Sequence, residues 1–163
     1  MAEKILQREE IAAQDKWAIE DLYATDEAWY EDLALLKQEI IKIPAYRGRL
    51  GQSASTLYEY MLLDEKIGLL LENLANYAQR KCDEDTRVAA YQAMVGQITS
   101  VWVETAASSS FETPELLAIA DKTLEQFYQA EPKLTLYKRK FENLRRRREH
   151  ILTDAEEKIL AAA

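Results

Sequence analysis

The chain has 163 residues, of which 48% are hydrophobic and 31% are charged, a composition typical of one soluble globular domain. Its formal net charge of −8 argues against nucleic acid or an anionic membrane as the main partner, because like charges repel before contact. Four glycines and three prolines are few turn-forming residues for this length, so we expect an all-α fold with long helices.

Residues 1–24 are the first predicted segment, an extended or loosely helical lead-in. Thr25 or Asp26 can then accept a hydrogen bond from the free amides of a first helical turn, and a single helical domain is predicted over residues 25–163. Alternating spacings of four and three residues predict the buried face of the first helix. That face consists of Trp29, Leu33, Leu36, Ile40 and Ile43. Pro44 is expected to end the helix.

Two long helices are predicted next, over about residues 54–81 and 85–110, each ~40 Å long at ~1.5 Å per residue. Ser53 or Ser55 can cap the first, and Asp85 or Thr86 the second. Because the connection is short, the two must pack as an antiparallel hairpin, around which a helical bundle is built. The expected buried stripes are Tyr60, Leu63, Ile67, Leu70, Leu74 and Tyr77 in one helix, and Val88, Tyr91, Val95, Ile98, Trp102 and Thr105 in the other.

Shorter helices are predicted in the last third of the chain. Thr113 would cap one of them, with Pro114 in its first turn, a second would cover residues 121–130, and a third would start around Pro132. The last of these would turn inward the residues Leu134, Tyr137, Phe141 and Leu144. Thr153 and Glu156 then predict a capping box. The chain stops soon after this helix begins, so we expect a fragment of a longer protein.

A basic run stands out in this acidic chain. It comprises Lys133, Lys138, Arg139, Lys140 and Arg145 to Arg148. No nucleic-acid-binding motif accompanies it. We interpret it as a solvated helix face, or as one that meets acidic groups of the rest of the chain.

Candidate catalytic residues are scarce. With a single histidine, His150, the chain cannot form a two-histidine zinc site, and neither Cys82 nor the serines at 108–110 lie in a nucleophile-elbow motif. The sequence therefore predicts no catalytic residue, metal ligand or bound cofactor. A single cysteine excludes an internal disulfide, and the charged N-terminus lacks the apolar core of a signal peptide, so a cytoplasmic location is expected.

The densest acidic cluster spans Asp83, Glu84 and Asp85. It does not fit a calcium loop, because Val88 stands where an EF-hand needs glycine. Two interpretations stay open: the cluster caps the third helix, or the tip of the hairpin reaches another domain.

Five segments, in this order and spacing, resemble the N-terminal region of oligoendopeptidase F, in the thimet-oligopeptidase-like zinc metallopeptidase family. They are KWAIEDLYATDEAWYEDL, YRGRLGQSASTLYE, LANYAQRKCDEDTRVAAYQAM, ETAASSSFETPELLAI and LTLYKRKFENLRRRREHILTDAEEKILA. The resemblance implies a parent enzyme that hydrolyses short peptides in a channel between two helical halves, with zinc held by an H-E-x-x-H helix. This chain lacks that motif, so it is expected to be inactive alone and to form a wall of the channel.

The resemblance also implies two contact surfaces. A hairpin tip formed by Tyr77, Arg80, Asp83, Glu84 and Asp85 would approach the channel or the opposite half. A lead-in formed by Trp17, Ile19, Leu22 and Tyr23, which has no assured partner in the first helix, would dock on the catalytic domain of the same polypeptide. Trp17 should then be more exposed than Trp29 or Trp102. A chain without that domain exposes apolar surface and can self-associate. The alternative is a free-standing helical adaptor or oligomerisation module without peptidase activity.

Overall fold

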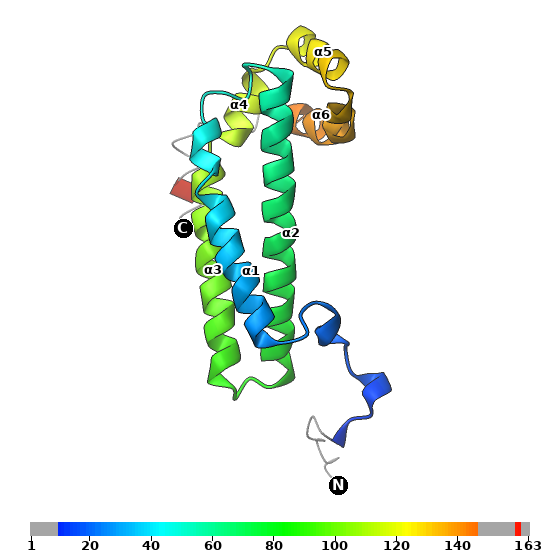
Figure 1. Cartoon of the computed structure of the whole chain (residues 1–163), viewed down its shortest axis with the longest axis vertical. Coiled ribbons are helices and arrows are strands. Elements are labelled where there is room, and N and C mark those ends of the chain that lie inside the picture. The colour runs from blue at the N-terminus through cyan, green and yellow to red at the C-terminus, as the bar shows by residue number, and fades with distance from the viewer. Residues whose placement is uncertain (1–9, 147–158, 161–163) are drawn as a thin grey trace.

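The computed structural model describes residues 10–146 and 159–160, and within them all regular structure is helical. The helices are α1 (Asp26–Ile40), α2 (Ala54–Glu84), α3 (Ala89–Ser109), α4 (Glu112–Ala118), α5 (Asp121–Ala130) and α6 (Lys138–Arg146). Short 3₁₀ helices lie at Ala13–Asp15, Ile19–Asp21, Ile43–Tyr46 and Pro132–Tyr137. Figure 1 shows α1, α2 and α3 side by side in a long bundle, with α4, α5 and α6 gathered at the end away from the N-terminal segment. The predicted all-α fold and antiparallel hairpin are confirmed.

Side-chain caps begin the first two helices where the sequence predicts them. The Thr25 hydroxyl accepts the Ala28 N–H at 3.3 Å, and the Ser53 hydroxyl accepts the Thr56 N–H at 3.1 Å. Each bond satisfies one of the amides that a first helical turn leaves without a partner. At its other end α1 stops at Ile40, ahead of the 3₁₀ helix that contains Pro44.

The core forms where α1 packs on the α2–α3 hairpin. The predicted stripe of α1 is buried, and Trp29 is fully so. The Trp29 indole N–H donates to the carbonyl oxygen of Leu74 on α2 at 2.8 Å. This bond satisfies the polar atom of a buried aromatic side chain. It also fixes how α1 lies against α2.

The hairpin turn differs from the prediction. α2 continues through the acidic cluster to Glu84, and α3 begins only at Ala89 without a side-chain cap. The Asp85 carboxylate instead accepts the Arg87 N–H at 3.0 Å, so the prediction that Asp85 or Thr86 caps α3 is wrong. The cluster holds no glycine or proline to stop a helix, and the chain turns where an aspartate binds the backbone two residues ahead.

The seam of α3 is also shifted. Its buried residues are Met94, Ile98, Val101 and Thr105, of which Ile98 and Thr105 belong to the predicted stripe and Met94 and Val101 do not. Trp102, predicted to lie in the core, is 48% exposed. α3 carries apolar residues on several sides, so spacing alone did not identify the side that meets α1 and α2.

The last third of the chain follows the prediction closely. α5 has the predicted bounds, and Leu134 and Phe141 are buried. α4 begins one residue before Thr113, after a buried Phe111, so Thr113 is not its cap. The capping box predicted at Thr153 and Glu156 lies outside the described residues, as does His150. No helix in the described ranges is long and apolar enough to cross a membrane.

Candidate functional surfaces

The predicted hairpin tip divides into a buried and an exposed part. Tyr77 belongs to the core: its hydroxyl donates to Asp26 at 2.8 Å, and its ring meets the Tyr23 ring edge-on at 5.4 Å. Burial, more than the bond to Asp26, raises the pKa of Tyr77. Tyr77 is therefore not available at the surface of the tip.

The charged residues of the tip lie near the end of α2. Arg80 forms an ion pair with Asp83 at 3.8 Å, and Asp83 accepts the Gln79 amide at 2.7 Å. Hydrogen bonds from the Arg87 side chain, and then from its N–H, lower the pKa of Asp85 to about 2. The carboxylates of Asp83 and Asp85 are thus held by neighbouring side chains of the same hairpin.

The lead-in also divides. Ile19 and Tyr23 are buried in the core of this chain, and the Tyr23 hydroxyl donates to Asp32 on α1 at 3.0 Å. The expectation that these two residues lack a partner here is wrong, because the 3₁₀ helix at Ile19–Asp21 folds the lead-in back onto α1 and α2. Trp17 and Leu22 stay exposed. Trp17 is 59% exposed, against 48% for Trp102 and 0% for Trp29, as expected.

Arg80 contacts the lead-in and also lines a groove that was not predicted from the sequence. Its guanidinium lies 5.0 Å from the centre of the Trp17 ring, close enough for a cation–π contact. Arg80 also lines a cavity of about 320 Å³ between α2 and α3, which extends to Trp102. The other lining residues are Glu72, Ala75, Asn76, Gln79, Val95, Ile98 and Thr99. The sequence signal that could have indicated this groove is the composition of α3, which has one charged residue, Glu104, among 21.

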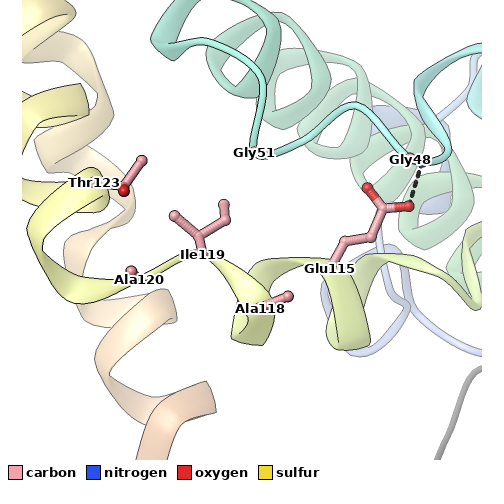
Figure 2. Close-up of a pocket in the computed structure, with 7 residues that line it drawn as sticks. All are labelled: Gly48, Gly51, Glu115, Ala118, Ile119, Ala120 and Thr123. Carbon is pink, nitrogen blue, oxygen red and sulfur yellow. Dashed lines mark hydrogen bonds between the residues drawn. The ribbon is translucent and has the colours of Figure 1, made fainter.

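A second cavity, of about 380 Å³, lies at the other end of the bundle between the 48–51 loop and α4–α5 (Figure 2). Glu115 accepts the N–H of Gly48 and, at 3.3 Å, the N–H of Leu50. Figure 2 shows Ile119 turned toward Gly51 across this space. The Glu115 carboxylate is already bound by backbone amides, so we assign this cavity to the attachment of the loop rather than to a ligand.

The basic run meets acidic groups, as one of its two interpretations predicts. The Lys140 ammonium binds Asp64 at 2.7 Å and Glu112 at 2.8 Å, and Glu112 also accepts the Tyr60 hydroxyl at 2.9 Å. Arg145 pairs with Asp121 and donates to a backbone carbonyl. These contacts tie α6 to α2, α4 and α5. Part of the run, from residue 147 on, is outside the described residues.

Zinc does not fit the donors that the structure describes. Across residues 10–146 and 159–160, no group of three or more histidine, cysteine, aspartate or glutamate side chains could hold a metal ion. A catalytic zinc needs three such ligands around one point. No chemical step is therefore assigned to a metal within this part of the chain.

Known proteins resemble this chain along nearly all of its length. The family model described as Oligopeptidase F matches residues 115–163. Oligopeptidase PepF of Bacillus subtilis is 32% identical over 162 residues, which cover 99% of this chain and 24% of that protein. Group B oligopeptidase PepB of Streptococcus agalactiae is 31% identical over 156 residues, which cover 96% of this chain and 26% of that protein.

A solved structure has the same fold. Oligoendopeptidase-F from Enterococcus faecium matches with a TM-score of 0.79 at 27% identity, over 85% of this chain and 28% of that one. The chain thus spans about a quarter of the length of the relatives that it matches. Its sequence and fold are those of the N-terminal helical region of the oligoendopeptidase F family.

Proposed function

We propose that this chain, as the N-terminal helical region of a zinc-dependent oligoendopeptidase, confines short peptides near a catalytic domain and takes no part in bond cleavage itself. The observation that carries the proposal is the alignment, which covers 99% of this chain but 24% of a relative named as an oligopeptidase. The free-standing adaptor is not favoured, because every relative cited above is a peptidase several times longer.

The division of labour follows from the residues present. One histidine in the whole chain cannot supply the two that an H-E-x-x-H zinc helix needs. The metal-activated water that attacks a peptide carbonyl would therefore be held by the catalytic domain of the same polypeptide. The domain proposed here comprises residues 25–163, with the lead-in of residues 1–24 attached through Ile19 and Tyr23.

The partners are that catalytic domain and short peptides, and neither nucleic acid nor a membrane. We also infer a cytoplasmic location, which the single cysteine supports because disulfides are rare in a reducing compartment. Within the proposed channel wall, Asp83 and Asp85 at the hairpin tip are the residues that we propose to meet peptides or the opposite half.

The test of the function compares the chain alone with the polypeptide that its reading frame encodes. The longer polypeptide should contain H-E-x-x-H and hydrolyse short peptides but not folded proteins, and a chelator should abolish this activity. The chain alone should show no hydrolysis. A stop codon directly after Ala163, or chelator-resistant hydrolysis by the purified chain, would overturn the proposal.

The role of the tip has its own test. The variants Asp83→Ala and Asp85→Ala should change the ratio of kcat/KM values across a panel of peptides in that longer polypeptide, because carboxylates near a channel select peptide charge. Thr86→Ala, an uncharged change in the same turn, is the matched control. Equal ratios for all variants would remove the tip from the channel.

A further inference from the structure

The outer side of α3 is nearly free of charge, with its one charged residue, the exposed Glu104, at the edge. Seven exposed residues lie on the side opposite its buried seam, and none of them is charged. They are Ala89, Gln92, Ala93, Gly96, Thr99, Ser100 and Val103, called here the α3 outer face. In a chain that is 31% charged, a helix face open to water normally carries charged side chains. Loss of charge is instead the compositional mark of the covered centre of an interface.

The polar groups of this face are already bonded within the chain. The Thr99 hydroxyl donates to the Val95 carbonyl at 2.8 Å, and the Ser100 hydroxyl donates to the Gly96 carbonyl at 3.0 Å. The Gln92 amide donates to the Thr86 carbonyl at 2.6 Å. A partner can therefore cover the Thr99 and Ser100 hydroxyl groups without leaving their donors unsatisfied, which lowers the penalty for burying polar groups.

Gly96, at the centre of the face, has no role in the packing of this chain. A Cβ atom built on it would meet nothing within 4 Å, so no neighbour here requires a glycine. Glycine inside a helix is less favourable than alanine because its backbone loses more freedom on folding. The close approach of a second backbone from outside would account for it.

The groove between α2 and α3 continues the face on one side. Thr99 belongs to both, and Trp102, which is 48% exposed, borders the groove. The groove is lined by apolar side chains of α3 and by polar and charged side chains of α2, such as Glu72 and Arg80. An exposed aromatic ring beside such a groove is a typical anchor of a protein interface. The face and the groove together form one surface with an aromatic residue at its edge.

The size and charge of this surface identify its occupant. α3 has 21 residues, so at ~1.5 Å per residue and a width of ~10 Å its face presents roughly 300 Å². Two separate copies usually need about 800 Å² from each partner, and they would each bring a net charge of −8. A domain tethered in the same polypeptide needs less area. Interfaces between domains of one chain start at about 600 Å² in total, which is about 300 Å² from each side.

We propose that the α3 outer face, with Trp102 at its edge, packs against an uncharged helical surface of the polypeptide that the relatives carry beyond the region matched by this chain. The inference rests on the proposed function, because the additional polypeptide is the part of the oligoendopeptidase relatives that this chain does not cover, about three quarters of their length. The α3 outer face is a different surface from the lead-in, which is the docking surface predicted from the sequence.

Thiol labelling tests the inference. Cys82 is replaced by serine, and Ser100→Cys places a single thiol on the face. Ser55→Cys, the same change at an exposed position at the start of α2, is the matched control, and Thr99→Cys repeats the measurement on the face. In the longer polypeptide, a maleimide should label positions 100 and 99 about tenfold or more slowly than in the chain alone, because labelling then waits for local opening. Position 55 should label equally in both.

The outcomes separate the two proposals. Peptide hydrolysis by the longer polypeptide, together with rapid labelling at position 100, would overturn this inference and leave the function standing. Protection of position 100 in the chain alone that grows with its concentration would assign the face to a second copy and also overturn it. A reading frame that stops at Ala163 would overturn both.

Discussion

Replacing Gly96 by alanine should stabilise the isolated chain. The position lies inside α3, and an added Cβ meets nothing within 4 Å, so the change adds helix propensity without a clash. The gain expected for Gly→Ala inside a helix is about 1 kcal/mol, equivalent to roughly 2–4 °C in Tm for a chain of this size. Gly48→Ala is the matched control. Its surroundings are equally open, but its φ is +75°, a conformation that costs an L-residue about 1–2 kcal/mol.

Circular dichroism during thermal and urea unfolding measures both variants. The expected result is opposite signs: a higher Tm for Gly96→Ala and a lower Tm for Gly48→Ala. In the longer polypeptide the gain at position 96 should shrink or reverse, because the methyl group then meets the covering domain. A neutral or destabilising effect of Gly96→Ala in the isolated chain would refute the reasoning that its surroundings are open.

Three further changes test individual contacts. Trp29→Phe removes the bond to the Leu74 carbonyl and leaves a void in the core, so urea unfolding should show a loss of roughly 1–3 kcal/mol. Glu115→Ala frees the loop amides that it binds, so hydrogen exchange in that loop should accelerate while α2 exchanges as before. For Asp85, whose pKa is lowered to about 2 by Arg87, an NMR titration should give a midpoint near 2. The stabilisation from this ion pair is present above the ordinary aspartate pKa and is lost as the pH falls toward 2. Arg87→Ala should raise the midpoint part of the way toward the ordinary value of about 4, because the N–H of residue 87 still donates to Asp85.

Sequence reasoning succeeded where local signals agreed with packing. For α1, the cap at Thr25 and the spacing from Trp29 onward both specify one buried side, because the other side is charged. For α3, the spacing of apolar residues does not specify one buried side, because the helix has one charged residue and several sides that could be buried. The burial of Met94 and Val101, in place of the predicted Trp102, depends on the side chains of α1 and α2, which spacing within α3 does not contain.

The ends of elements were the other source of error. Nothing in the sequence from Cys82 to Glu84 stops a helix, and α2 extends until Asp85 binds the backbone of Arg87.

Contacts between distant residues were also missed. The burial of Tyr23 against Tyr77 joins residues far apart in sequence. Such a contact exists only after the lead-in has folded back, so a reading of the lead-in alone could not find it.

Two of the three tryptophans now mark one side of the hairpin. Trp17 lies over Arg80, Arg80 lines the groove, and Trp102 lines the same groove. An exposed indole ring is costly to keep in water unless something covers it. A domain that packs on the α3 outer face and into the groove would meet Trp102 and lie near the Arg80 side chain that Trp17 contacts, so one partner would account for the exposure of both rings. Of the four lead-in residues first expected to dock, Ile19 and Tyr23 are buried in this chain, so that role would fall to the exposed Trp17 and Leu22. The larger share of the contact would fall to α3.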